Sequence, residues 1–264
     1  MENKQQKIIQ MFDAIAPSYD LANRVISLGI DVKWRKEACV KALELLPNKE
    51  LVIADVACGT GDMIIHWEEA IAAENKAHAK PTTKESENPR AQVKRQARFV
   101  GIDPSSGMLE VAKEKLAPLL DSQNAKLIQA QAQDLSALES SSIDIVSIAY
   151  GLRNVMEVDR ALEEFHRVLK ERGILVILEF TKKSKEGILD KLAGFYTKII
   201  LPLLGGLISK NYAAYAYLPD SIDVFLSAEI LTSKLRQRGF CVNVSKGYSA
   251  NISTLIIATK EING

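Results

Sequence analysis

The sequence predicts an α/β fold: a doubly wound, mostly parallel sheet of seven strands with helices on both faces. Near-continuous apolar segments alternate with amphipathic helical patterns, which is typical of parallel strands covered on both faces. The first apolar segment, 52–56, runs into the glycine turn 59–61, and a helical pattern follows at 63–67. The last two apolar segments, 239–246 and 252–260, are expected to return to the sheet as an antiparallel pair at one edge.

Residues 1–46 predict a helical lid ahead of the sheet. Apolar residues recur at helical spacing as far as Ile15, Pro17 interrupts the pattern, and a second helical pattern runs over 34–46. Between the two patterns, 18–23 is polar and aromatic and poorly suited to a core. Because this region precedes the first strand, we expect it to cover the ligand edge of the sheet.

Strands and helices alternate along the rest of the chain. Ser105 is a favoured N-cap for the helix after the second strand. We expect further strands at 98–103, 126–130, 143–150 and 174–180, and helices at 104–120 and 157–170. Together with the lid, these elements predict a single domain over residues 1–264.

Two segments differ in composition from the rest. Residues 74–98 hold two prolines and seven Lys/Arg against three Glu, so they predict a basic, mobile surface insertion. Contact of this insertion with nucleic acid or lipid headgroups is the less favoured alternative. Residues 192–209 are strongly apolar, but Lys198, Pro202 and the glycine pair 205–206 count against a membrane span. A core helix, a wall for an apolar substrate and a patch that dips into a bilayer surface stay open.

The composition is that of an ordinary folded protein. A chain of 264 residues with 47% hydrophobic and 25% charged residues can bury a core. The net charge of +1 gives no overall attraction to nucleic acid or anionic membranes. Three widely spaced cysteines form no Cys-x-x-Cys pair, which argues against disulfides and zinc and suits a reducing cytosol. The first residues carry no apolar run of the kind that a secretory signal needs. We therefore expect a cytoplasmic protein without a metal.

The glycine turn predicts a ligand site at the carboxyl ends of the first two strands. Gly59 and Gly61 leave room for a ligand at the backbone, and the helix that follows points N–H groups toward the turn. Asp103 ends the second strand, where a carboxylate takes ribose hydroxyls in such sheets. Asp55 and Asp62 flank the turn and suit a cationic ligand. S-adenosylmethionine, with its ammonium, sulfonium and ribose groups, fits this pattern.

Two other interpretations of the turn stay open. A dinucleotide site requires a third glycine three residues after the second, where this chain has Ile64. A nicotinamide oxidoreductase is therefore the least favoured enzyme. The turn could also connect strand and helix without any ligand, and Asp103 argues against that alternative.

Motifs along nearly the whole chain, apart from 74–98, are together more specific than the glycine turn. They are Phe12-Asp13-x-Ile15-Ala16-x-x-Tyr19-Asp20-x-x-Asn23, Ser27-x-Gly29, Trp34-Arg35, Gly59-Thr60-Gly61-Asp62, Gly101-Ile102-Asp103, Met108-Leu109, Gly151-Leu152-Arg153-Asn154-Val155, Ala161-Leu162-x-Glu164, Arg167-Val168-Leu169, Leu178-Glu179-Phe180 and Tyr215-x-Tyr217-Leu218-x-x-Ser221-Ile222. With these motifs the chain resembles the ubiquinone/menaquinone-biosynthesis C-methyltransferases, which use S-adenosylmethionine. The resemblance implies a class I methyltransferase that methylates a ring carbon of a polyprenyl quinol.

The resemblance also implies a cofactor pocket that touches Thr60, Asp103 and the pair Gln131-Ala132. Where this chain has Cys58, family members usually have glycine and sometimes cysteine, and where it has Gln131 they usually have asparagine, so the chain is a divergent member. The candidate cofactor-binding residues are Asp55, Gly59, Thr60, Gly61, Asp62, Asp103, Met108, Gln131 and Ala132.

Five residues are candidates for catalysis under the same resemblance. A ring carbon becomes a good nucleophile when the adjacent hydroxyl loses its proton, and a phenol titrates near pH ~10. We expect Arg153 to stabilise the oxygen charge and Asn154 to fix the ring or an ordered water. Tyr19, Asp20 and Tyr217 are expected to orient the hydroxyl or to pass its proton through water. The structural alternatives are an ion pair of Arg153 with a helix carboxylate and a helix cap by Asp20.

The expected partner is the polyprenyl quinol, and no nucleic acid is expected. Peripheral contact with the inner face of a membrane and a homodimer stay open. Two other functions also stay open: a non-catalytic subunit of a quinone-synthesis assembly, and a methyltransferase for another small aromatic or lipid substrate. Demethylmenaquinol and the equivalent ubiquinol precursor are not distinguished by the sequence, because the head group is recognised through the shape of the pocket.

Overall fold

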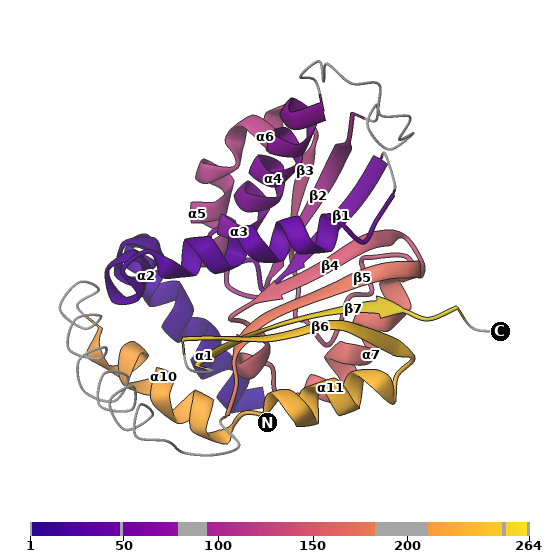
Figure 1. Cartoon of the computed structure of the whole chain (residues 1–264). Helices are drawn as coiled ribbons and strands as arrows, with labels where there is room; N and C mark the ends of the chain where they lie inside the picture. The colour runs from indigo at the N-terminus through magenta and orange to yellow at the C-terminus, as the bar shows by residue number, and fades with distance from the viewer. Residues whose placement is uncertain (1, 48–49, 79–93, 183–210, 250–251, 263–264) are drawn as a thin grey trace.

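A computed structural model describes residues 2–47, 50–78, 94–182, 211–249 and 252–262, and it confirms the doubly wound α/β fold. One seven-stranded sheet has the order β3-β2-β1-β4-β5-β7-β6 (Figure 1). The strands are β1 Glu50–Val56, β2 Gln96–Asp103, β3 Ala125–Gln129, β4 Ile143–Ala149, β5 Leu169–Phe180, β6 Phe240–Tyr248 and β7 Ser253–Lys260. The first five strands pair in parallel, and β7 is antiparallel to both β5 and β6, so the predicted antiparallel edge pair is confirmed.

The strand order reverses at β1, and this reversal sets where a ligand can bind. β2 pairs with one side of β1 and β4 pairs with the other side. Connections therefore leave the two neighbouring strands in opposite directions, and a crevice forms outside their carboxyl ends. The glycine turn follows β1 directly and so lies at this crevice.

Helices cover both faces of the sheet (Figure 1). α3, α4, α5 and α6 share one buried cluster with one face, and α7 and α11 share another with the opposite face. The described helices are α1 Glu2–Ile15, α2 Tyr19–Ser27, α3 Ile30–Leu43, α4 Asp62–His78, α5 Ser106–Lys115, α6 Ala117–Asp121, α7 Val158–Val168, α10 Tyr212–Val224 and α11 Ala228–Arg236, with the short 3-10 helices η1 Ala16–Ser18 and η3 Leu152–Asn154.

The N-terminal region divides into two parts. α1 and α2 lie at the carboxyl end of the parallel strands, where the lid was expected (Figure 1). Leu28 and Gly29, both with positive φ, turn the chain between α2 and α3. α3 then packs into the core, because Trp34 and Ala38 are buried in the same cluster as the helices of that face. The part of 1–46 that covers the ligand edge is therefore α1 and α2.

Some element boundaries differ from the sequence prediction. The helix expected over 104–120 is two helices, because Leu116 leaves the helical conformation before Pro118 enters the first turn of α6. α7 ends at Val168, and β5 begins at Leu169, ahead of its predicted start.

The predicted insertion and the apolar segment lie largely outside the described residues. Of the insertion 74–98, the first residues continue α4 to His78 and the last ones belong to β2, while 79–93 are not described. The apolar segment 192–209 is not described either. In the described parts of the chain, no helix is both long enough and apolar enough to span a bilayer.

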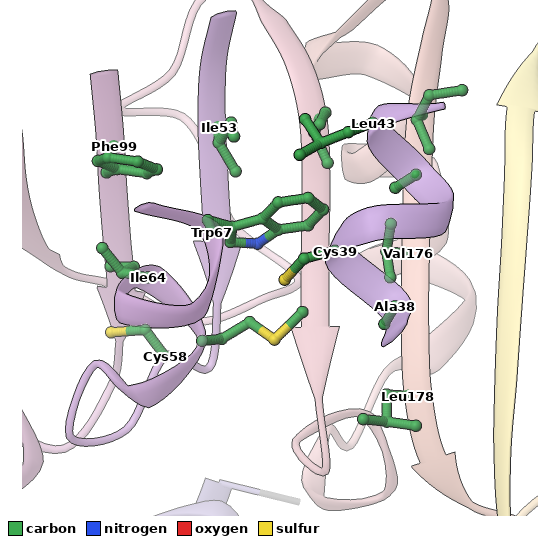
Figure 2. Packing of buried hydrophobic residues seen from close by; sticks show 14 of the residues in the cluster. Ala38, Cys39, Leu43, Ile53, Cys58, Ile64, Trp67, Phe99, Val176 and Leu178 are labelled. Carbon is green, nitrogen blue, oxygen red and sulfur yellow. The ribbon is translucent and has the colours of Figure 1, made fainter. Parts of the chain in front are cut away.

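Trp67 occupies the centre of the core between α4 and the sheet. Its indole lies among Ile53, Ile64 and Cys39 (Figure 2), and none of its surface is exposed. The indole Nε1 donates a hydrogen bond of 3.1 Å to the Ser147 hydroxyl on β4. A large buried aromatic residue of this kind dominates the packing energy of a core, and its N–H needs an acceptor inside the protein.

We expect Trp67→Ala to lower the free energy of unfolding by about 3–5 kcal/mol, because the cavity left in the core cannot collapse completely. Trp67→Phe should cost less, since it retains most of the ring volume and loses the bond to Ser147. Urea unfolding followed by circular dichroism measures both. Leu21→Ala is the control, because Leu21 is 61% exposed and its truncation should change stability by less than about 0.5 kcal/mol. Equal losses in Trp67→Ala and Leu21→Ala would contradict this account of the core.

Candidate active site

The glycine turn is held in a shape that other residues would strain. Gly59 and Gly61 both have positive φ, of 54° and 85°. A Cβ on Gly61 would meet the Leu116 side chain at 2.8 Å. The turn is fixed to the sheet because the Cys58 N–H donates to the Ile102 carbonyl at 3.0 Å. The turn thus presents bare backbone at the crevice between β1 and β4.

Asp103 joins the ends of the first two strands. Its Oδ2 accepts the Gly59 N–H at 2.8 Å, and its Oδ1 accepts the Ser105 N–H at 2.9 Å. The side chain is buried, and burial raises the pKa of its carboxyl to about 6. The carboxylate therefore lies beside the glycine turn, as the sequence predicted.

A first cavity opens at this carboxylate, between the turn and α1. Five of the nine predicted cofactor-binding residues line it: Gly59, Asp103, Met108, Gln131 and Ala132. The other lining residues are Gln5, Ile8, Ile9, Phe12, Tyr19, Ala57, Pro104, Ser105, Gln133, Ala149, Tyr150, Gly151, Asn154 and Val155. α1 forms the roof of this cavity.

α1 is fixed to the N-terminus of α5 by one carboxylate. Asp13 Oδ1 accepts hydrogen bonds from the Ser105 hydroxyl at 2.6 Å and from the Gly107 N–H at 2.9 Å. Ser105 is also the N-cap of α5, since its hydroxyl accepts the Met108 N–H at 3.1 Å. The negative charge is favourable at a helix N-terminus. The roof and the floor of the first cavity are thereby connected.

Thr60, Gly61, Asp62 and Asp55 do not belong to the lining of the first cavity. The Thr60 hydroxyl donates to Asp20 Oδ1 at 2.6 Å, so this predicted cofactor residue meets a predicted catalytic one. Lys115 Nζ lies 2.6 Å from both Asp20 and Asp62. These contacts fasten α2 to the turn outside the lining of the first cavity.

Asp55 points into the core, where Ser147 donates to its Oδ1 at 2.7 Å. The carboxyl is almost completely buried, and this burial raises its pKa to about 7. The hydrogen bond from Ser147 and the charge of Arg35 act in the opposite direction and only partly offset burial.

A second cavity lies next to the first and is mostly aromatic and apolar. Its lining residues are Met11, Phe12, Ile15, Tyr19, Asn23, Ile26, Ser27, Asp31, Trp34, Arg35, Tyr150, Arg153, Phe180, Tyr217 and Leu218. Phe12, Tyr19 and Tyr150 line both cavities. These three side chains therefore form the boundary across which two ligands would face each other.

Arg153 lines the second cavity but is already paired. Its Nη1 lies 2.7 Å from Glu179 Oε1, and the Glu179 side chain is only 1% exposed. Its Nε donates to the Ser221 hydroxyl at 3.3 Å, and its guanidinium lies over the Phe180 ring. The predicted alternative of an ion pair is thus present, although the carboxylate lies on strand β5 and not on a helix.

The structure brings the other catalytic candidates to different places. Tyr19 borders both cavities, and burial raises the pKa of its phenol. Asn154 lines the first cavity, and its Oδ1 is buried without a hydrogen-bond partner. Tyr217 lines the second cavity, and burial raises its pKa. Asp20 lines neither cavity and is bound to Thr60 and Lys115.

Two residues of the site were not among the sequence candidates. Arg35 is buried in the lining of the second cavity, with its guanidinium carbon 5.1 Å from the centre of the Tyr150 ring. Tyr150 follows β4, and its hydroxyl lies 3.2 Å from the Ser253 hydroxyl. Arg35 stands in the Trp34-Arg35 motif, and this was the only signal for it in the sequence. Within the described residues, no group of His, Cys, Asp and Glu is placed to hold a metal ion.

The fold, the glycine turn and the carboxylate after β2 define a class I S-adenosylmethionine-dependent methyltransferase. Solved structures support the fold. A SAM-dependent methyltransferase from Aquifex aeolicus aligns with a TM-score of 0.51 at 15% identity, over 82% of this chain and 86% of that one. The cyclase SpnF aligns with a TM-score of 0.65 at 15% identity, over 98% and 97%.

The chain belongs to the ubiE/COQ5 methyltransferase family, whose model matches residues 1–260. The ubiquinone/menaquinone biosynthesis C-methyltransferase UbiE of Campylobacter jejuni strain 81-176 is 49% identical over 97% of this chain and 99% of its own length. The demethylmenaquinone methyltransferase of Bacteroides fragilis strain ATCC 25285 is 34% identical over 97% and 94%. Family and fold together imply S-adenosylmethionine as the cofactor, and the resemblance found in the sequence is confirmed.

Because Glu179 is buried, we expect Arg153→Met to cost about 3–5 kcal/mol of stability by leaving an unpaired carboxylate in the core. The double variant Arg153→Met/Glu179→Gln should lose clearly less, since neither member then carries a charge. Urea unfolding of both single variants and the double variant gives the coupling energy. Additive losses would show that the pair is not coupled.

The buried Asp55 predicts a pH dependence of stability. Its pKa is raised from about 3.8 in the unfolded chain to about 7 in the folded protein. The protein therefore has the full contribution of this group to its stability below pH 3.8, and it loses that contribution as the pH rises toward 7. Asp55→Asn cannot ionise, and it should therefore gain stability relative to the parent from about pH 4 to about pH 7, by at most about 1.4 kcal/mol per pH unit, and the difference should stay constant above pH 7. Asp103 titrates in both proteins, and its charge is one of the causes that raise the pKa of Asp55. A stability difference that does not change with pH would contradict the assignment.

Proposed function

We propose that this protein transfers a methyl group from S-adenosylmethionine to a ring carbon of a polyprenyl quinol, demethylmenaquinol or the equivalent ubiquinol precursor. The observation that carries the proposal is the shared boundary of the two cavities at Phe12, Tyr19 and Tyr150. A methyl donor in the first cavity and an aromatic ring in the second would meet there. The names of the Campylobacter and Bacteroides relatives support a quinone precursor as the acceptor.

The residues of the first cavity fit S-adenosylmethionine. Asp103 offers a carboxylate to the ribose hydroxyls, and Met108 and Ala132 offer apolar surface to the adenine. The unpartnered Asn154 Oδ1 would gain a hydrogen bond from the ammonium group, which removes the cost of a buried acceptor. When bound, the cofactor supplies a methyl group on a positively charged sulfur and leaves as a neutral thioether.

The residues of the second cavity fit a quinol ring. Phe180 and Trp34 offer aromatic surface, and Ile26 and Leu218 continue the apolar wall. The ring carbon becomes nucleophilic when the neighbouring hydroxyl is ionised, and a phenol in water titrates near pH ~10. The site must therefore favour the phenolate form. After the new carbon–carbon bond forms, the proton on that ring carbon leaves and the ring becomes aromatic again.

Tyr19 and Tyr217 are the side chains that we propose for orienting the hydroxyl and passing its proton toward water. Both line the second cavity, and the burial that raises their pKa keeps both phenols neutral, so each can donate and accept a hydrogen bond. Asn154 lies on the first-cavity side of the boundary and is proposed to hold the donor in line. Arg153 positions the wall that carries Tyr150, because its Nη1 also donates to the Tyr150 carbonyl.

Asp20 acts on the lid in this proposal and not on the ring. It binds Thr60 and Lys115, and so it holds α2 against the turn while both ligands are enclosed. Exclusion of water matters because electrostatic interactions strengthen in a dry site.

We expect Asp103→Asn to weaken binding of S-adenosylmethionine by about 10–100-fold, because charged hydrogen bonds to ribose contribute about 1.5–3 kcal/mol. Isothermal titration measures the affinity, and transfer of a labelled methyl group to a short-tailed demethylmenaquinol measures activity. Asp121→Asn is the control, since Asp121 is an exposed aspartate at the end of α6.

The outcomes separate the alternatives. Unchanged affinity in Asp103→Asn would remove this residue from the cofactor site. Cofactor binding by the parent protein without any methyl transfer would favour a non-catalytic subunit. Label that appears only in another compound after incubation with a lipid extract would favour a different aromatic or lipid acceptor.

A further inference from the structure

The second cavity contains two arginines, and they differ in how their charge is neutralised. Arg153 and Arg35 both line the cavity, and the Arg35 guanidinium lies over the Tyr150 ring. Both side chains are less than a tenth exposed. A buried guanidinium needs a carboxylate or other acceptors, because the cost of removing it from water is several kcal/mol. The partners of each arginine therefore show which one has charge available for a ligand.

The charge of Arg153 is neutralised by a carboxylate of the protein itself. Glu179 Oε1 accepts its Nη1 at 2.7 Å, and Glu179 Oε2 accepts its backbone N–H at 3.1 Å. Ser221 and the Tyr150 carbonyl accept two further hydrogen bonds from the guanidinium. With an almost fully buried carboxylate beside it, Arg153 contributes little net positive charge to the cavity.

Arg35 is paired less closely than Arg153. Its Nε is buried and donates no hydrogen bond to any described residue. The nearest carboxylate oxygen, Asp31 Oδ2, lies 3.5 Å away. That carboxylate is already engaged, since Arg24 binds the same oxygen at 2.6 Å and Ser27 binds the other at 2.6 Å.

We propose that Arg35 binds the ionised oxygen of the acceptor and is the residue that lowers the pKa of the bound phenol. This inference rests on the proposed function. The guanidinium faces the Tyr150 ring, and Tyr150 borders the first cavity, so an oxygen held by Arg35 lies close to the boundary that the methyl group crosses. Binding of the anion releases the phenol proton to water and gives Arg35 the acceptor that it lacks.

The other charged and titratable groups around Arg35 do not take over this role. The carboxyl groups of Asp31, Asp62 and Asp55 would oppose a phenolate, and the Arg35 charge acts on Asp55 as well. Lys115 and Arg24 are bound to Asp62. The phenols of Tyr19 and Tyr150 are buried, and burial raises the pKa of both. Of the two described arginines that line the second cavity, Arg35 has the looser ion pair: it lies 3.5 Å from an Asp31 oxygen that Arg24 also binds, whereas Arg153 lies 2.7 Å from Glu179.

The test compares Arg35→Gln with Arg35→Lys in the full-length protein, with Lys36→Gln as the matched control. Lys36 is the next residue on α3, and its side chain is 53% exposed and paired with Glu69 outside the cavity. The probe is 4-nitrophenol, whose ionised form absorbs visible light, titrated on each protein in the presence of S-adenosylhomocysteine. Methyl transfer to a short-tailed demethylmenaquinol is measured from pH 6 to pH 10.

We expect the bound nitrophenol of the parent protein to titrate at lower pH than in solution. In Arg35→Gln this lowering of the nitrophenol pKa should disappear. Its kcat should fall about 100–1,000-fold at neutral pH, and the remaining activity should rise with pH into the alkaline range. Arg35→Lys should recover part of the shift and of the rate, because it keeps the charge without the planar fork. Lys36→Gln should behave like the parent protein.

The proposal is overturned if Arg35→Gln leaves both the probe titration and the pH profile of turnover as in the parent protein. If Arg35→Gln does not fold, 4-nitroanisole on the parent protein decides the result. This ether cannot ionise, so its affinity should not rise with pH as that of the phenol does, and parallel behaviour would count against the proposal. A parent protein that binds the probe but methylates no quinol would contradict the proposed function and leave the Arg35 titration as a separate result.

Discussion

The carboxylate of Asp103 is the interaction on which the geometry of the site depends. It accepts the backbone N–H groups of Gly59 and Ser105, which belong to the turn after β1 and to the start of α5. Charged hydrogen bonds to backbone donors are stronger and shorter than neutral ones, so neither segment can move without a substantial loss. Asp13 extends the same arrangement to the roof, since it binds Ser105 and Gly107. Two carboxylates therefore position the turn, the cap of α5 and α1 together.

The lid has one strong and one weaker attachment. α1 is held at the buried N-terminus of α5 by Asp13, whereas α2 is held by ion pairs of Arg24 and Lys115 that remain partly exposed to water. Partly exposed ion pairs contribute only about 0–1 kcal/mol each. The ion pairs of α2 are therefore a weak attachment, and its packing adds to them, because Ala22 is buried in a cluster with Ile15 and Met108.

The sequence predicted those parts of the structure that depend on local pattern. Strand periodicity gave the sheet, and the position of Asp103 at the end of β2 placed it beside Gly59, because parallel strands end at the same edge. The sequence did not predict the hydrogen bond between Thr60 and Asp20, since these residues are forty positions apart and belong to different layers. The alternative role of Arg153 placed its carboxylate partner on a helix, and the partner lies on β5, because a lone arginine in a motif carries no information about which buried carboxylate it reaches. Boundaries such as the early start of β5 depended on pairing with β4 and not on propensity.

The positive charge that each arginine contributes to the second cavity depends on its ion-pair and hydrogen-bond partners, and not only on its distance from the ligand. A site that must ionise a neutral phenol needs a net positive charge near the oxygen, inside walls that exclude water. Glu179 cancels Arg153, and Arg24 engages Asp31 from outside the cavity, so each of these charges has a counter-ion nearby. Arg35 is buried against Tyr150 and shares Asp31 with Arg24 at the longer distance of 3.5 Å, and its Nε donates no hydrogen bond within the described residues. Folding must carry the cost of this unmade hydrogen bond, and an anionic ligand would recover it. Such a cost is expected where a protein uses the charge, because a residue that only filled space could be replaced by a neutral side chain with a gain in stability.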